Sequence, residues 1–104
     1  MRVLSVRFKS TLPLKDLEAP WRDVALEIAA VPGLLSKTWI HDGDYFGGIY
    51  TFRDQASLDA YAAGPIVAAI MSNPAFSDFR LEQFDVLEAL STITRGIPAA
   101  TASR

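Results

Sequence analysis

Several segments of the chain alternate apolar and polar side chains, the pattern of an extended strand. Between residues 4 and 8, Leu4, Val6 and Phe8 alternate with two polar residues. A period of two places successive side chains on opposite faces of a sheet, so this segment is predicted to be a strand. Three further strands are expected over residues 34–41, 45–53 and 79–87. The Asp42-Gly43-Asp44 sequence between the second and third strands predicts a hairpin turn.

Between the first two strands the apolar spacing changes to three and four residues, the period of an amphipathic helix. The positions concerned are Leu17, Trp21, Val24, Ile28 and Val31. Proline has no N–H to donate, so Pro20 is expected in the first helical turn, after a lead-in over residues 14–17. Pro32-Gly33 ends this helix.

Two short helices are predicted between the third and fourth strands. Asp54 is a favourable N-cap for a helix that Gly64 closes. Pro65 suits the first position of another helix that continues to Met71. The order strand, helix, strand, strand, helix, strand is that of the ferredoxin-like βαββαβ fold of the α+β class. We expect a four-stranded antiparallel sheet with its helices on one face, a domain over residues 1–95, and a flexible tail over 96–104.

Such a sheet leaves one face without helices, and residue parity predicts which side chains lie there. The set expected to face the helices is Leu4, Val6, Phe8, Tyr50, Phe52, Phe84 and Val86. The set expected on the open face is Ser5, Arg7, Ile49, Thr51, Asp85 and Leu87, where Arg7 and Asp85 could pair with each other or across a dimer. This mixture of apolar and charged residues is typical of an interface, so a homodimer with the two sheets face to face is predicted.

Composition narrows the functional classes. The formal net charge is −2, and the ten basic residues are interspersed with twelve acidic ones, so nucleic acid is not an expected partner. The chain has no cysteine, which fits a reducing compartment, and a cytoplasmic location is expected. The longest apolar run, residues 65–71, is far shorter than the roughly 20 residues that cross a bilayer, so no membrane association is expected.

Candidate site residues come from the aromatic set and its neighbours. Tyr50, Trp39 and Tyr61 each carry a polar group that needs a partner when buried, and a substrate oxygen could be that partner. Lys37 shares the strand parity of Trp39, and its ammonium either extends to solvent or points at the substrate. His41 is the only histidine and a candidate general base, or else an exposed turn residue.

Four more aromatic residues are candidates for lining a ligand cavity, or are simply core. They are Phe8, Phe52, Phe84 and Trp21. His41, Asp42 and Asp44 form a poor set of metal ligands, so no metal site is expected. No phosphate-binding glycine loop or dinucleotide fingerprint occurs, so the sequence does not encode a flavin or nicotinamide site.

Four parts of the chain together resemble the YdhR-like mono-oxygenases of the dimeric α/β-barrel superfamily. They are residues 32–39, residues 47–52, Tyr61, and residues 84–86. The resemblance covers nearly the whole chain and implies a dimer with a ligand cavity between sheet and helices. It further implies a cofactor-independent mono-oxygenase that uses molecular oxygen on a small aromatic or polyketide-like compound.

In that interpretation Tyr50, Trp39 and Tyr61 orient the substrate oxygen, and His41, Lys37 or a bound water acts as base. Because this fold supports several functions, two alternatives stay open. One is a non-catalytic dimer that binds a small apolar ligand or serves a stress response. The other is a haem-binding or haem-degrading protein.

Overall fold

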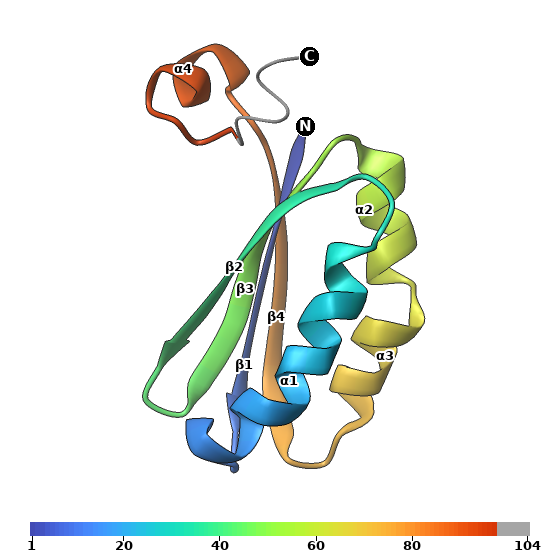
Figure 1. The fold of residues 1–104 in the computed structure, drawn as a ribbon, viewed down its shortest axis with the longest axis vertical. Helices are drawn as coiled ribbons and strands as arrows, with labels where there is room; N and C mark the ends of the chain where they lie inside the picture. The colour runs from blue at the N-terminus through green and yellow to red at the C-terminus, as the bar shows by residue number, and fades with distance from the viewer. Residues whose placement is uncertain (98–104) are drawn as a thin grey trace.

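Four antiparallel strands form a single sheet, and three helices cover one of its faces (Figure 1). The computed structural model describes residues 1–97. The strands are β1 (Arg2–Ser10), β2 (Leu34–Asp42), β3 (Tyr45–Phe52) and β4 (Phe76–Asp85), in the spatial order β2-β3-β1-β4. The helices are α1 (Leu14–Ala29), α2 (Gln55–Ala62), α3 (Pro65–Ser72) and α4 (Glu88–Ile93). The predicted ferredoxin-like α+β fold is confirmed.

The register between β1 and β3 places the core. Leu4 lies opposite Tyr50, Val6 opposite Gly48, and Phe8 opposite Phe46. Because paired residues point to the same face of a sheet, these side chains all lie beneath the helices. Leu4, Val6, Phe8, Tyr50, Phe46 and Phe52 are each at most 7% exposed. The parity prediction for the two central strands is therefore confirmed.

The same prediction was wrong for β4. Phe84 lies opposite Val3, on the open face of the sheet, and is 50% exposed. The cause is the register with β1, which places Leu81 opposite Val6 on the helix face. An irregularity near Asp78, whose φ is +57°, shifts the pairing, so that both Phe76 and Phe79 contact Phe8. Phe84 therefore cannot line a cavity with Phe8 and Phe52.

The expectation that Asp85 shares the open face with Arg7 and could pair with it within one chain was wrong for the same reason. Asp85 lies opposite Arg2, whose guanidinium Nη1 donates to the Asp85 carboxylate at 2.9 Å. Arg7 instead lies opposite Arg80 on the open face.

Helix α1 begins earlier than predicted. It starts at Leu14 after the extended residue Pro13, and Pro20 lies inside it rather than in its first turn. Pro20 cannot donate a hydrogen bond to the Asp16 carbonyl, and its ring crowds that carbonyl. Leu17, which is 3% exposed, packs the early turns against the core, and this tertiary contact accompanies the earlier start of the helix.

The local signals for the two short helices are confirmed. The Asp54 carboxylate accepts a hydrogen bond from the Ser57 N–H at 2.8 Å, as an N-cap does, and Pro65 opens α3. Helix α4 was not predicted, and Figure 1 shows it away from the three covering helices. In the predicted tail Ile97 is buried at 8% exposure, while residues 98–104 lie outside the described part of the chain. No helix within residues 1–97 is long and apolar enough to span a membrane.

Gly47 and Gly48 on β3 allow two different close approaches. A Cβ on Gly47 would overlap the backbone carbonyl oxygen of Val6. A Cβ on Gly48 would instead overlap the side-chain Cε of Lys37, on the helix face. The first glycine allows the pairing of β1 with β3, and the second makes room for a lysine side chain.

We expect the two glycines to differ sharply when replaced by alanine. Gly47→Ala must displace the backbone of β1 and should lower the free energy of unfolding by about 3 kcal/mol or more. Gly48→Ala should change it by less than about 1 kcal/mol, because the flexible end of Lys37 can move away. Urea denaturation measures both values, and Gly96→Ala, where the added Cβ meets only ordinary contacts, is the control. Equal losses at the two positions would contradict this reading.

Candidate functional site

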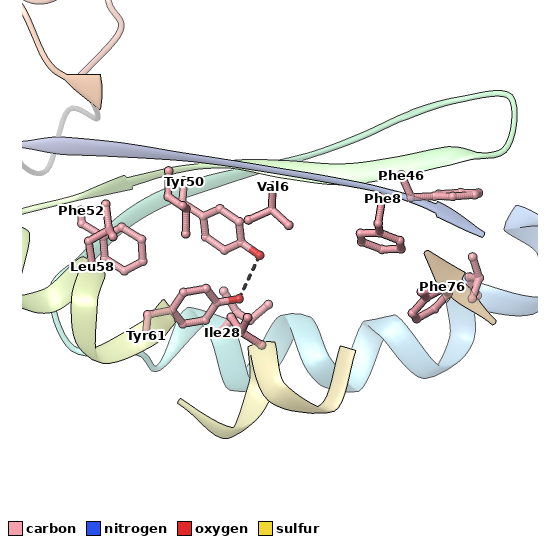
Figure 2. Close-up of a cluster of buried hydrophobic side chains, with 12 residues drawn as sticks. Val6, Phe8, Ile28, Phe46, Tyr50, Phe52, Leu58, Tyr61 and Phe76 are labelled. Carbon is pink, nitrogen blue, oxygen red and sulfur yellow. Dashed lines mark hydrogen bonds between the residues drawn. The ribbon is translucent and has the colours of Figure 1, made fainter. Parts of the chain in front are cut away.

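The aromatic side chains beneath the helices form two groups. The Trp cluster consists of Phe8, Trp21, Trp39, Phe46, Phe76 and Phe79, with ring centroids 4.7–6.2 Å apart in its contacting pairs. The Tyr cluster consists of Tyr50, Phe52 and Tyr61, with centroids 5.0–6.0 Å apart. Figure 2 shows members of the two clusters toward opposite ends of the core. Gly48 lies between them along β3.

The Tyr cluster is buried, and its polar side-chain groups are the two tyrosine hydroxyls. The Tyr61 hydroxyl donates to the Tyr50 hydroxyl at 2.9 Å, drawn as the dashed line in Figure 2. Tyr50 and Tyr61 are 2% and 5% exposed. Burial raises the pKa of both hydroxyls, and for Tyr50 the neighbouring Tyr61 raises the pKa further. Both tyrosines are therefore neutral phenols that satisfy each other, and neither serves as a base near neutral pH.

Lys37 joins the two clusters. It lies on β2 opposite Tyr50, so its side chain is on the helix face. Its ammonium Nζ lies 3.3 Å from the ring centroid of Trp39 and 4.5 Å from that of Tyr50. The lysine stem reaches this position by crossing β3 at Gly48, where no side chain blocks it. The sequence had suggested that the ammonium extends to solvent or points at a substrate, whereas the structure places it over two aromatic rings.

The surroundings of Lys37 favour its neutral form. Within residues 1–97 its ammonium makes no salt bridge and no hydrogen bond to a side chain or carbonyl. Burial lowers the pKa of Lys37 to about 7. The two aromatic faces attract the cation and oppose this shift, each contact being worth about 0.5–2 kcal/mol. The uncharged amine is therefore more populated in Lys37 than in an exposed lysine at the same pH.

An open groove of about 350 Å³ lies between α1 and the end of β2, and it shares the Trp39 ring with Lys37 without being lined by the lysine itself. Its apolar walls are mainly aromatic, and Glu18 and Arg22 of α1 add charged groups. The lining residues are Leu14, Glu18, Trp21, Arg22, Trp39, Ile40, His41 and Phe46. Trp39 is 38% exposed and forms part of this wall while its ring also contacts Lys37. A groove of this volume accommodates a small flat molecule.

The predicted site residues thus divide into three sets. Trp21, Trp39 and His41 line the groove, and Lys37 lies against Trp39. Tyr50 and Tyr61 lie behind them in the core, with Phe8 and Phe52. His41 is exposed, and its ring stacks on Phe46 with centroids 5.7 Å apart and planes at 16°.

Phe46 is a groove residue that sequence reasoning missed. It is 2% exposed and contacts both Trp21 and His41. The signal was present, because Phe46 has the same parity on β3 as Tyr50 and Phe52. As for metals, no group of three or more His, Cys, Asp or Glu side chains within residues 1–97 is arranged to hold an ion.

Comparison with known proteins places this geometry in context. The family model described as "Putative mono-oxygenase ydhR" matches residues 3–97. The search of curated proteins gave no match. Among solved structures, the NE2512 protein of unknown function from Nitrosomonas europaea is 28% identical, with a TM-score of 0.67 over 83% of this chain and 88% of that one.

Two other solved structures share the fold at lower identity. One is an N63A mutant of SnoaB from Streptomyces nogalater, a cofactor-independent oxygenase, with 17% identity and a TM-score of 0.66 over 83% of this chain and 92% of that one. The other is the haem degrader MhuD from Mycobacterium tuberculosis, with 20% identity and a TM-score of 0.57 over 82% of this chain and 95% of that one.

The lowered pKa of Lys37 makes a prediction about stability. In the unfolded chain a lysine holds its proton up to a pKa of about 10.4, whereas the folded protein releases this proton near pH 7. Between these values the unfolded state binds more protons, so the free energy of unfolding contributed by Lys37 rises with pH. Below about pH 7 that contribution is at its lowest.

Denaturant titrations of the native protein and Lys37→Met from pH 6 to pH 10 test this directly. The native free energy of unfolding minus that of Lys37→Met should rise by on the order of 2 kcal/mol across this range. The exposed Lys15, replaced in Lys15→Met, is the matched control and should give a flat difference. A flat difference for Lys37→Met as well would show that the folded-state pKa of Lys37 is ordinary.

Proposed function

The chain belongs to the ydhR mono-oxygenase family, and from that premise we propose that it is a cofactor-independent mono-oxygenase acting on a small, flat, acidic aromatic compound. The observation that carries the proposal is the Lys37 amine, which lies against the Trp39 ring at the side of an aromatic groove. The fold shared with the cofactor-independent oxygenase SnoaB supports the reaction class. The haem-degrading neighbour shares the same fold and so does not decide between the two functions.

The groove would supply binding and orientation. Trp21, Trp39 and Phe46 present aromatic surface on which a planar ring can stack. A substrate stacked on Trp39 would share that ring with Lys37, whose Nζ lies 3.3 Å from the ring centroid. Apolar walls also limit the access of water to a reactive carbanion, which favours its reaction with oxygen.

Lys37 would supply the base. As a neutral amine it takes a proton from the acidic C–H or phenolic O–H of the substrate, and the resulting ammonium then pairs with the substrate anion. A pKa near the working pH suits this role, because base and conjugate acid are both populated. His41 is the other candidate base. It lines the groove and stacks on Phe46 but is exposed, so we assign it to the rim of the site.

The electrons for oxygen activation would come from the substrate anion itself. For an anthrone-like ring methylene, oxygen adds to the carbanion to give a hydroperoxide. Loss of water then leaves a carbonyl, so one oxygen atom enters the product and the other becomes water. The four electrons that reduce dioxygen all come from the substrate carbon, and no flavin, haem or metal is needed. The protein has only to bind the substrate, remove one proton from it, and limit the access of water to the carbanion.

We further propose that the protein acts as a homodimer that uses its open sheet face. Ile49 and Phe84 lie on this face and are 37% and 50% exposed. Leu87, which follows the end of β4, is 71% exposed. Arg7 and Arg80 lie opposite each other on the same face, and like charges in this arrangement favour an acidic partner group. Lys37 and Trp39 lie on the other face of the sheet, so such an interface leaves the groove open.

Oxygen uptake tests the proposed reaction. Purified protein supplied with an anthrone or a naphthoquinol should consume oxygen above the uncatalysed rate, without added cofactor. Lys37→Met should lower kcat/KM by about 100-fold, the contribution of a positioned general base, while Lys15→Met leaves it unchanged. The kcat/KM of the native enzyme should fall as pH drops below about 7, because Lys37 becomes protonated. No uptake above the blank, or full activity in Lys37→Met, would argue against the proposal.

Light scattering at micromolar concentration tests the assembly. The native protein should have twice its chain mass of 11.4 kDa. Ile49→Glu places a charge at the centre of the open face and should shift the mass toward one chain. Leu26→Glu is the matched control, because Leu26 is also exposed, at 71%, but lies on α1. A native mass of a single chain would contradict the dimer.

A further inference from the structure

Three charged side chains on the open face of the sheet have no partner among residues 1–97. Arg7 on β1 lies opposite Arg80 on β4, and Glu82 lies two residues further along β4, opposite Ser5. The three charged residues are exposed, and none of them makes a salt bridge or a side-chain hydrogen bond within this range. Like charges on neighbouring strands repel each other, so the two arginines favour an acidic group from outside the chain.

A largely polar cavity of about 340 Å³ contains the two arginines. It is lined by Arg7, Tyr45, Asp78 and Arg80. Asp78 makes no salt bridge with either arginine. Two arginines and one aspartate leave one positive charge uncompensated, so a single further carboxylate would make the cavity neutral.

The open face carries two neighbouring rows of residues that complement each other. In the spatial order β2-β3-β1-β4, the first row is Thr38, Ile49, Ser5 and Glu82. In the same order, the second row is Ile40, Gly47, Arg7 and Arg80. On β3 and β1 a large residue in one row corresponds to a small residue in the other, and on β4 the two rows carry opposite charges.

We propose that a second copy of the chain completes this cavity: Glu82 of each copy pairs with Arg80 of the other, in a homodimer whose sheets are related by a half-turn about an axis across the strands, between the two rows. This inference rests on the homodimer proposed above and adds its orientation. The half-turn places each strand over its own counterpart with the direction reversed, so the first row of one sheet faces the second row of the other. Ile49 then faces Gly47, which has no side chain, and the Glu82–Arg80 pair occurs twice, as in any isologous interface.

The proposed axis lies at the middle of the sheet. The residues between the two rows are Trp39, Gly48, Val6 and Leu81, which lie near the midpoints of the four strands. A half-turn about the middle keeps the two sheets in overlap along their whole length and so buries the most apolar surface. Facing sheets pack about 10 Å apart, and arginine and glutamate side chains that extend from opposite sides are long enough to meet across this gap.

Other half-turns fit the charges less well. An axis along the strands places β4 over β2 of the second copy, so that Arg80 faces Ile40 and Glu82 faces Thr38. Both charges are then buried without a partner, which is strongly unfavourable. An axis across the strands but level with either row places Arg80 against Arg80 or Glu82 against Glu82. Charge complementarity therefore selects the axis between the rows.

Charge reversal tests the pairing. Arg80→Glu and Glu82→Arg each bring like charges together, so each should raise the dissociation constant of the dimer by on the order of 100-fold, measured by analytical ultracentrifugation. A mixture of the two variants should form a heterodimer of near-native affinity, because both of its pairs again join opposite charges. Lys15→Glu makes the same charge change on the exposed side of α1 and is the control. It should not weaken the dimer, and it should not restore assembly when mixed with Glu82→Arg.

Cross-linking tests the orientation without changing a charge. The chain has no cysteine, so Thr38→Cys introduces a single thiol, on β2. In the proposed dimer β2 faces β2, and a short bis-maleimide should join the two thiols in most dimers. With an axis along the strands β2 would face β4, at the opposite edge of the sheet, and the two thiols would lie too far apart. A cross-linking yield no higher than that of Lys15→Cys would overturn the orientation.

The outcomes separate this pairing from the proposals above. A native mass of one chain would overturn both the dimer and the pairing. A native dimer that Ile49→Glu dissociates but that Arg80→Glu and Glu82→Arg leave intact would overturn the pairing alone. Circular dichroism confirms that each variant is folded. Oxygen uptake depends on the groove and Lys37 on the other face of the sheet, so its success or failure is scored independently.

Discussion

Strand β3 lacks side chains at two successive positions, and the arrangement of the site depends on this. Since neighbouring residues of a strand face opposite sides, Gly47 and Gly48 act on different neighbours. Gly47 lets the backbone of β1 approach closely enough to pair, which sets the register of the whole helix-facing core. Gly48 leaves the space that the Lys37 stem crosses. The two glycines therefore allow both the pairing of β1 with β3 and the position of the Lys37 side chain.

The electrostatics of the site follow from what surrounds Lys37. Two tyrosines near it are neutral because burial disfavours the phenolate, and they bond to each other. The aromatic faces attract a cation, but they do not replace the hydration that the ammonium loses. The balance lowers the pKa of Lys37 to about 7 within an apolar region. In the proposed reaction this amine removes one proton from the substrate.

The relatives share the fold while differing in chemistry, so the function must be argued from side chains. An oxygenase, a haem degrader and a protein of unknown function all superimpose on more than four fifths of this chain. In the present chain those side chains are Trp21, Trp39 and Phe46, which wall a groove, and Lys37, which contacts the Trp39 ring. In the proposed function these walls bind a flat molecule and the lysine acts on an acidic one.

The sequence by itself determined the fold class, the elements and the helix-facing residues of β1 and β3. These are local properties, because alternation, N-caps and turn residues act over a few positions. Only the tertiary structure decided the face of Phe84, since the irregularity near Asp78 shifts the pairing of β4 and no period within that strand reveals it. The burial of Lys37 was likewise a tertiary result. It required β2 to pair with a glycine-bearing β3 and two aromatic clusters to enclose the ammonium, contacts between residues that the sequence places in separate segments.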